Sequence, residues 1–519
     1  MSAIVTDQFR ILNASNFVDS IDSANNSYYI TVGLPNPAIN AYGRSTTWNT
    51  NPPTPTDSIS SNAHSGDVVL YGKRITGANV RRIVRKLDWV AGNRYEMYRH
   101  DYDINSPAPI TNASRLYDAN YYVMNEDYRV YICIENGSSG NNLKGNVSLD
   151  QPTFTDLEPS RAGDSGDGYI WKYLYTITPS DIIKFDSTEY ITVPNDWSTS
   201  TDTQIRSIRE SADSSLNDNQ IRTVYIAAEG ANYANGLGQE FDLIGDGTGG
   251  KVRVDVEGGK ITNTTVVSGG KDYSYAFVDL GSINSNTTGT SANLVPIIPP
   301  SKGHGFDVYK ELGTDRVLVY ARFDDSTKDF PVDTSFAQVS IVKNPTKVGT
   351  SDIYTENTFS GLFSLKLDDS SLSGKPKVGE EIVQTLSVGK ARGYVASWDD
   401  ETKVLKYFTD RSLFINQTTQ DTQDYTGIST NGRSYSFNSN GGTINGQVSN
   451  FTGSIDSAFS GITTNPSGTK LINLGVDFTN GIAVPEINKG SGEIIYLDNR
   501  SSIARNPRQK EDLKIILEF

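Results

Sequence analysis

Apolar and polar residues alternate along much of this chain, and the stretch KVRVDVE at 251–257 shows the pattern most clearly. Valine occupies every second position there and a charged residue occupies the others, so a strand would place the three valines on one buried face. Gly258 and Gly259 follow, and glycine adopts positive φ without steric cost. We therefore expect a tight hairpin that leads into a second strand over 260–267.

Other runs rich in β-branched and aromatic residues predict a mainly β fold built from many short strands. The last run places Leu513, Ile515, Leu517 and Phe519 on one face, so we expect the carboxyl end to join a sheet. The remaining predicted strands cover 130–134, 316–323, 339–342, 382–385 and 393–397.

Helical periodicity is rare in this sequence. The apolar residues of 80–87 have the spacing i, i+3, i+4, i+7, which predicts a short amphipathic helix. Its other face would carry four basic residues, which we interpret as a solvated or partner-facing surface, with a nucleic-acid contact as the alternative. A second helix is predicted over 203–211. The four basic residues are Arg81, Arg82, Arg85 and Lys86.

The length of 519 residues suggests about three domains at roughly 150 residues each. The segment 224–234 resembles 266–276, and the two copies flank GDGTGG at 245–250, so we expect a small two-fold β module over about 220–297. A second β-rich module is expected over 347–485. Its Asn/Ser/Thr/Gly-rich tract at 418–466 is either a loop-rich β region or partly disordered.

The net charge limits the kinds of molecule that this protein is expected to bind. The chain has 46 basic and 61 acidic residues, a net charge of -15, which disfavours wide contact with nucleic acid or with anionic membranes. Cys133 is the single cysteine, so no intrachain disulfide can form. The amino-terminal stretch MSAIVTDQFR lacks the pattern of an export signal, and no segment approaches the ~20 apolar residues of a membrane span. We expect protein or carbohydrate partners.

The stretch GDSGDGYIWKY at 163–173 raises the question of catalysis, because GDSG surrounds the nucleophile of chymotrypsin-like proteases. His64, Asp101 and Asp103 precede Ser165 in the order His, Asp, Ser that those enzymes show. Order is not geometry, and the motif continues with Asp-Gly where those proteases have Gly-Pro. We therefore favour a turn in which the glycines take positive φ and the aspartates bond backbone amides, followed by a buried strand over 169–177.

Metal and phosphate motifs are weaker still. A calcium loop of the EF-hand type that began at Asp164 would require glutamate where Tyr175 stands, and Asp246 in GDGTGG is better explained by a turn. The three histidines, His64, His100 and His304, form no zinc-binding pattern. Paired carboxylates for glycoside hydrolysis stay open, but no pair is nominated. The sequence therefore nominates no catalytic, cofactor-binding or metal-binding residue and no cofactor.

Eleven stretches in order along the chain resemble the baseplate wedge subunit, gene product eight, of T-even-type contractile-tailed bacteriophages. The motif GDGYIWKYLYTI at 166–177 resembles the Gly-Asp-Gly-Tyr-x-Trp-x-Tyr turn and strand of that family. The other stretches are AIVTDQFR (3–10), NFVDSI (16–21), YYITVG (28–33), GRSTTW (43–48), PPTPTDS (52–58), RKLDW (85–89), VYICIEN (130–136), YITVP (190–194), GFDVYKELG (305–313) and the closing segment from SGEIIYLDN to the carboxyl end (491–519).

The resemblance covers about 1–205, 300–346 and 486–519. It implies a discontinuous β-sandwich core with small helical excursions, into which two β-rich modules, 206–299 and 347–485, are inserted. It also implies a homodimer that packs against other baseplate wedge proteins in the virion tail, assembled in the host cytoplasm.

Two functions follow from the sequence. The first is a structural, non-enzymatic subunit that acts through protein interfaces in tail assembly and contraction, with anchors drawn from the 28 tyrosines. The alternative is a carbohydrate- or receptor-binding tail protein that uses the inserted modules, because their Tyr, Asn, Gly and Ser content suits recognition surfaces. In either case Trp171 and Trp89 are expected to pack internally, and a fully buried tryptophan costs roughly 3–5 kcal/mol when replaced by alanine.

Overall fold

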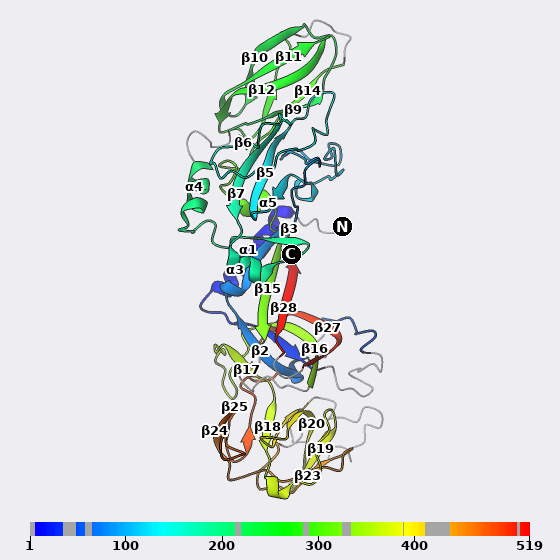
Figure 1. Cartoon of the computed structure of the whole chain (residues 1–519), viewed down its shortest axis with the longest axis vertical. Coiled ribbons are helices and arrows are strands. Elements are labelled where there is room, and N and C mark those ends of the chain that lie inside the picture. Colours follow the sequence, from blue (N-terminus) through cyan, green and yellow to red (C-terminus); the bar gives the residue numbers. More distant parts are fainter. Residues whose placement is uncertain are drawn as a thin grey trace. The chain divides into compact units, whose positions relative to one another are not determined.

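A computed structural model describes residues 6–34, 48–57, 65–212, 220–283, 290–323, 334–387, 389–409, 436–505 and 509–519. These residues form mainly antiparallel strands with a few short helices, so the predicted mainly β fold is confirmed. The chain divides into two compact units, and the sequence colours of Figure 1 show that each is assembled from separated segments. Unit 1 comprises Met1–Val18, Arg81–Leu318 and Ile516–Phe519, and unit 2 comprises Asp19–Val80 and Val319–Ile515.

A four-stranded sheet with the order β4-β5-β7-β6 forms the core of unit 1. Its central strands are covered on both faces, since Trp171, Lys172 and Tyr173 are consecutive and all buried. The predicted strands at 130–134 and 169–177 are confirmed. The bounds are Tyr122–Met124 for β4, Arg129–Asn136 for β5, Ser160–Arg161 for β6 and Tyr169–Thr176 for β7.

Among the described residues, three α-helices belong wholly to unit 1, namely α3 (Pro179–Phe185), α4 (Thr203–Ala212) and α5 (Val308–Leu312). Helix α4 packs against β7 and confirms the helix predicted at 203–211. Helix α1 (Asp7–Asp22) begins in unit 1 and was not predicted. The spacing of its buried residues Ile11, Ala14, Val18 and Ile21 is nevertheless helical, so the signal was present in the sequence.

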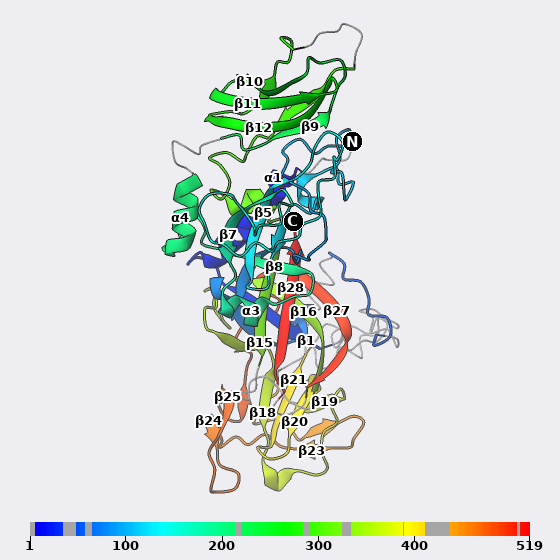
Figure 2. The ribbon, with the colours of Figure 1, turned by 45° about the horizontal axis from the view of Figure 1, so that its top comes forward.

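The segment 220–298 forms a β module within unit 1 with its own apolar cluster. Figure 2 shows β10, β11 and β12 as neighbouring strands of one layer, and the full order of the sheet is β12-β11-β10-β13. The three valines of 251–257 are buried, and Gly258 and Gly259 both have positive φ, so the predicted hairpin is confirmed. The bounds are Gly236–Gly245 (β10), Thr248–Glu257 (β11), Lys260–Lys271 (β12) and Ala276–Val278 (β13), and β9 (Val224–Ala228) pairs with β14 (Asn293–Pro296).

The internal echo of this module is real but offset by two residues from the sequence match. In the first copy Gly230 and Asn232 have positive φ and precede the buried Tyr233. In the second copy Gly270 and Asp272 have positive φ and precede the buried Tyr273. The structural equivalent of Tyr233 is therefore Tyr273, whereas the sequence match had paired it with Tyr275.

The helix predicted at 80–87 is wrong, because the structure has strand β3 (Val80–Arg85) there, paired with β8 (Tyr190–Val193). Val80, Ile83 and Val84 are buried in a strand that is covered on both faces. Such a strand has no alternation, so its apolar spacing resembles that of a short helix, and its β-branched residues favour the strand.

The interpretation of the basic residues of β3 as a solvated or partner-facing surface is also wrong. Arg81 forms an ion pair with Asp181 at 3.0 Å. The Arg82 guanidinium is buried and lies 4.2 Å from the centre of the Tyr309 ring. Arg85 donates hydrogen bonds to backbone carbonyls of the 117–119 segment. The arginines are thus bound by neighbours within unit 1.

The boundary between the units falls within β15 (Arg316–Phe323) and β28 (Glu511–Glu518), which belong to a sheet with the order β28-β15-β3-β8. Ile515 is buried and Leu513, Leu517 and Phe519 are half-buried, whereas Asp512, Lys514 and Glu518 are exposed. The predicted apolar face of the carboxyl-terminal strand and its place in a sheet are confirmed.

Unit 2 contains a five-stranded sheet with the order β17-β2-β1-β16-β27 and a seven-stranded sheet with the order β23-β22-β19-β20-β21-β18-β26. The predicted strands at 339–342, 382–385 and 393–397 lie in β16, β19 and β20. The bounds of the first sheet are Thr358–Ser360 (β17), Val69–Ile75 (β2), Tyr28–Gly33 (β1), Thr334–Lys343 (β16) and Glu493–Arg505 (β27). Those of the second are Thr452–Gly453 (β23), Ile444–Gly446 (β22), Glu381–Leu386 (β19), Gly389–Asp399 (β20), Val404–Phe408 (β21), Phe363–Lys366 (β18) and Ile482–Ala483 (β26).

The Asn/Ser/Thr/Gly-rich tract at 418–466 is described from 436 onward, and its first part lies outside the described residues. The described part contributes β22, β23 and β24 (Gly461–Thr464), the last of which pairs with β25 (Ile472–Phe478). The placement of 206–299 and 347–485 as insertions into one core stays a prediction. None of the helices formed by the described residues is long and apolar enough to cross a bilayer.

Candidate functional site

The GDSGDG stretch forms a turn ahead of β7, as predicted. Gly163, Gly166 and Gly168 all have positive φ. The buried Asp167 carboxylate accepts hydrogen bonds from the backbone N–H of Tyr169 at 2.9 Å and of Leu149 at 2.8 Å. These bonds join the turn to the start of β7 and to the preceding loop. The turn therefore has a structural role, in which the Asp167 side chain holds two backbone segments together through hydrogen bonds.

Ser165 lies at the exposed tip of this turn. Its backbone N–H donates a 2.8 Å hydrogen bond to Asp150 Oδ2. The Ser165 hydroxyl and N–H together hold the pKa of the Asp150 carboxyl below its ordinary value. No histidine is bonded to Ser165 among the described residues, and His64 lies outside them.

The aspartates considered as partners of Ser165 have other roles. Asp101 holds the Arg99 guanidinium through two hydrogen bonds of 2.9 and 2.7 Å. Asp103 accepts from the backbone N–H groups of Asn105 and Ser106, which closes a local turn. Neither aspartate is bound to an imidazole, and a triad is defined by that contact.

An aromatic stack lies directly behind the turn. The rings of Tyr169 and Trp171 are stacked with centroids 5.3 Å apart, and Tyr95 packs edge-on against Trp171 at 5.8 Å. Trp171 is 0% exposed. The Tyr169 hydroxyl accepts from the Tyr95 N–H at 2.9 Å and donates to the Asn146 carbonyl at 2.9 Å. The stack thus ties three distant stretches of unit 1 together.

The two described histidines are each bound to the protein. His100 Nδ1 accepts a hydrogen bond of 3.2 Å from the Ile298 N–H. His304 Nδ1 lies 2.5 Å from Glu311 Oε1, and Glu311 is fully buried. Across the described ranges, no group of three His, Cys, Asp or Glu side chains gathers closely enough to hold a metal ion.

The GDGTGG stretch is also a turn, between β10 and β11. The Asp246 carboxylate accepts from the backbone N–H of Ser274 at 2.9 Å and of Tyr275 at 3.2 Å, and from the Ser274 hydroxyl. These bonds, led by that of the Ser274 hydroxyl, lower the pKa of Asp246 to about 2. Asp246 therefore fixes the loop that presents Tyr275.

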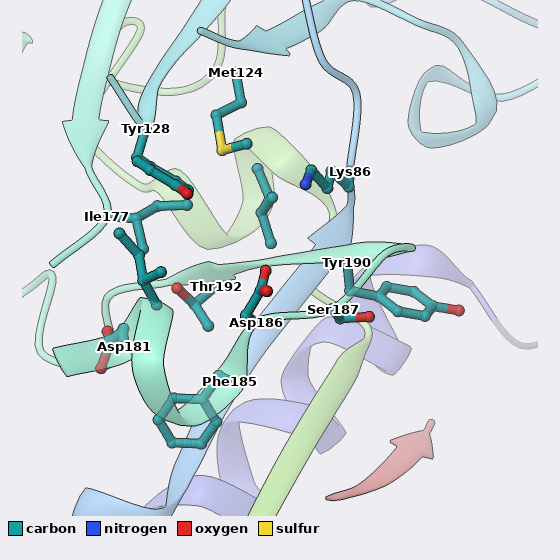
Figure 3. Close-up of a pocket in the computed structure, with 12 residues that line it drawn as sticks. Lys86, Met124, Tyr128, Ile177, Asp181, Phe185, Asp186, Ser187, Tyr190 and Thr192 are labelled. Carbon is teal, nitrogen blue, oxygen red and sulfur yellow. The ribbon is translucent and has the colours of Figure 1, made fainter. Parts of the chain in front are cut away.

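A hollow of about 280 Å³, part of it open to solvent, lies beside α3 (Figure 3). Met124, Ile177 and Phe185 are among its apolar lining residues. In Figure 3 the Lys86 ammonium and the Asp186 carboxylate both point toward its middle. Its lining includes neither histidine nor cysteine, and its walls are both polar and apolar.

Arg99 joins the β module 220–298 to the rest of unit 1. Its side chain is buried, and its guanidinium lies 4.0 Å from the centre of the Tyr225 ring on β9. Asp101 balances the charge and keeps the pKa of Arg99 above its ordinary value against the opposing effect of burial. Sequence reasoning missed this contact because its partners are more than a hundred positions apart.

Two further hydrogen bonds cross the same junction. Thr223 Oγ1 donates to Glu135 Oε1 at 2.8 Å, and Ile298 N–H donates to His100 as described above. Burial raises the pKa of Glu135 and lowers the pKa of His100. The junction is therefore polar and contains an imidazole that accepts a hydrogen bond.

Comparisons with known proteins fall on this part of unit 1. The family model for "Bacteriophage T4, Gp8" matches residues 148–232, which include the GDSGDG turn, β7 and α4. The chain is 26% identical over 218 residues to the baseplate wedge protein gp8 of Enterobacteria phage T4. That alignment covers 37% of this chain and 60% of the relative. The resemblance inferred from the sequence is confirmed, and the chain is similar to the gp8 baseplate wedge protein of phage T4.

Proposed function

We propose that this protein is a structural subunit of a phage tail baseplate, which acts through protein–protein interfaces and has no catalytic role. The observation that carries the proposal is the family match over 148–232. The matched turn and strand hold the aromatic stack, so the resemblance falls on residues that build the core of unit 1. The chain spans about 60% of the length of the curated relative, so its partners are part of the proposal.

The tyrosines of unit 1 support a rigid building block. Their hydroxyls donate to backbone carbonyls across the fold, which ties strands and loops together at buried positions. These bonds are Tyr121 to Glu311 at 2.7 Å, Tyr122 to Arg85 at 2.7 Å, Tyr131 to Phe154 at 2.7 Å, Tyr175 to Thr192 at 3.0 Å and Tyr309 to Pro194 at 2.8 Å. Such a body transmits movement by reorienting as a whole while its interfaces repack, which is what a contracting tail requires.

The interface anchors come from the exposed tyrosines in this proposal. Most tyrosines of unit 1 are buried, whereas Tyr128 and Tyr275 are exposed. Tyr128 has positive φ, a conformation rare for a bulky residue, and it lines the hollow beside α3. An exposed aromatic residue beside a surface hollow has the character of an interface hot spot.

Co-expression with the other baseplate wedge proteins of the same phage tests this function. We expect the chain to co-purify with at least one of them and the complex to appear in isolated tails. A Tyr128→Ala variant should weaken that complex, and Ser165→Ala is the matched control that should leave it unchanged. Failure of the wild type to bind any wedge protein would contradict the proposal. Sedimentation of the isolated chain tests the proposed homodimer.

A second candidate function rests on the outer face of the β module. Ile244 and Phe277 are cross-strand partners, and Phe277 is 49% and Tyr275 58% exposed. Asp246 fixes the loop that carries Tyr275. Exposed aromatic rings on a strand and on the loop before it are suited to stacking on sugar rings, which supports receptor or glycan binding by this module.

A glycan array probed with the wild type and with Phe277→Ser tests the second candidate. Binding that the substitution removes would favour recognition of host glycans. Arg253→Ser is the matched control, because Arg253 is on the polar part of the same sheet. An array without signal, together with no hydrolysis of host polysaccharide, would dismiss it.

A further inference from the structure

Lys172 is a buried cation without an acidic partner. It lies on β7 between Trp171 and Tyr173 and is 4% exposed. Its ammonium donates a hydrogen bond to the Leu157 carbonyl, and it forms no ion pair with any carboxylate among the described residues. A buried lysine in a protein is usually paired, because removing an ammonium from water costs several kcal/mol.

This side chain lines a hollow of about 300 Å³ that is partly open to solvent. Two other basic side chains, Arg222 and His304, and one acidic side chain, Glu158, line the same hollow. Gln220 also lines the hollow; its buried Oε1 has no hydrogen-bond partner in the described part of the chain, and as an acceptor it does not itself bind an anion. Several polar groups therefore line this partly open hollow.

The two carboxylates that act electrostatically on Lys172 are engaged by other donors. Glu158 accepts from the Arg222 guanidinium at 2.7 Å. Glu311 accepts from the Gly305 N–H at 2.7 Å and lies 2.5 Å from His304 Nδ1. Each carboxylate therefore interacts with a donor that is closer to it than Lys172 is. The Lys172 ammonium consequently has no anion in direct contact among the described residues.

The charge state of Lys172 agrees with this geometry. Burial lowers the pKa of Lys172 to about 8, and the nearby carboxylates Glu158 and Glu311 oppose that shift while Arg222 adds to it. The amine is therefore mainly protonated at neutral pH. An oxyanion in the hollow would accept hydrogen bonds from the N–H groups of the Lys172 ammonium that are not bonded to Leu157. It would thereby stabilise the protonated form of Lys172.

We propose that this hollow binds one oxyanion, a carboxylate or a phosphate, with Lys172 as its central cation and Arg222 at its rim. The anion comes either from an acidic side chain of a baseplate partner or from free phosphate in solution. Binding of a partner's acidic side chain rests on the proposed function, whereas binding of free phosphate does not. The two arms of the experiment described below distinguish these two sources of the anion.

The first arm measures binding of inorganic phosphate by titration calorimetry and by thermal unfolding at constant ionic strength, with chloride as the reference. We expect saturable binding by the wild type and at least a tenfold weaker affinity in Lys172→Met, which keeps the apolar stem and removes the charge. Lys172→Arg restores the cation and should recover part of the affinity. Lys271→Met, at an exposed position on β12, is the matched control.

A readout that does not depend on a variant is the titration of the Lys172 side-chain NMR signal. The pKa of Lys172 should rise when phosphate is present, because a bound anion favours the ammonium. If Lys172→Met does not fold, Arg222→Gln replaces it and should weaken phosphate binding as well.

The second arm repeats the co-purification with wedge proteins. A complex that is lost in Lys172→Met and retained in Lys172→Arg, without phosphate binding, identifies a partner's acidic side chain as the anion. Phosphate binding without a wedge complex supports the site and contradicts the proposed function. Absence of phosphate binding and of any complex that depends on Lys172 overturns the inference.

Discussion

Strands β7 and β11 belong to the same unit but bury their side chains in different ways. Consecutive residues of β7 are buried, because one face packs in the aromatic stack and the other is covered by α4 and neighbouring loops. In β11 the three valines are buried and the charged residues between them are exposed or half-exposed. The comparison teaches that alternation identifies a strand only where one face meets water.

Hydrogen bonding differs between the two regions as well. Around β7, tyrosine hydroxyls donate to carbonyls of distant segments, so the aromatic core is cross-linked over long sequence distances. In the β module, Tyr233 and Tyr273 each accept a backbone N–H, from Ala292 and Gly250 respectively. Each of these tyrosines follows a pair of positive-φ residues. The module therefore contains two copies of the same local structure, a turn with two positive-φ residues followed by a buried tyrosine, which we call the tyrosine corner.

The largest expected effect is the loss of the aromatic stack. Trp171→Ala should lower the free energy of unfolding of unit 1 by about 3–5 kcal/mol, because the indole is fully buried and leaves a cavity. Chemical denaturation followed by near-UV circular dichroism measures it. Trp89 was expected to pack internally and is only half-buried. Trp89→Ala should therefore lower the free energy of unfolding by less than Trp171→Ala does. Equal losses would contradict the difference in burial.

The two faces of β11 should differ clearly. Val254→Ala removes two buried methyl groups and should cost about 2 kcal/mol. Arg253→Ala removes an exposed ion pair with Glu240 and should cost about 0.5 kcal/mol or less. Denaturant titration of both variants is sufficient. A larger loss at Arg253 than at Val254 would show that the faces are assigned incorrectly.

The repeated tyrosine corner should contribute less than the buried valine. Tyr273→Phe leaves the buried Gly250 N–H without its acceptor and should cost about 1–2 kcal/mol. Tyr275→Phe is the control, since Tyr275 is exposed and the sequence echo alone had made it the equivalent of Tyr233. The thermal midpoint of each variant tests the offset of two residues. A loss at 275 and none at 273 would support the sequence match instead.

The smallest expected effect is a pH dependence at the junction. Burial lowers the pKa of His100, with Arg99 adding to the shift and Asp101 opposing it. The folded state therefore binds fewer protons than the unfolded state just below the ordinary value of about 6.5, so stability falls as the pH drops through this window. Protonation also removes the acceptor used by the Ile298 N–H.

Unfolding at pH 7.5 and pH 5.5 measures this effect in the wild type and in His100→Asn, whose amide oxygen can replace the acceptor. The wild type should lose more stability than the variant over this interval, because the variant has no group that titrates at position 100. An identical loss in both proteins would remove His100 as the cause.

Helix α1 and strand β3 show which part of the fold the sequence could yield. Ile11, Ala14 and Val18 have helical spacing, but Phe9 and Leu12 are exposed on the same helix, so the sequence signal for α1 is weak. Strand β3 is different, since its apolar spacing fits a helix while its β-branched residues favour a strand, and the pairing with β8 shows which of the two forms. The candidate site also contains one predictable and one unpredictable part. The GDSGDG turn could be predicted from the local chemistry of glycine and aspartate, whereas the environment of Lys172 could not.

The sequence by itself determined the mainly β character, the buried face of β11, the turn at 163–168 and the resemblance to the phage wedge protein, because each depends on residues close together in the chain. Only the tertiary structure decided that the arginines of β3 are bound internally, that Tyr273 is the equivalent of Tyr233, and that Lys172 lines a hollow without forming an ion pair with any described carboxylate. Those features depend on contacts between distant segments, and burial by a distant segment sets both the environment of a charge and the role of a tyrosine.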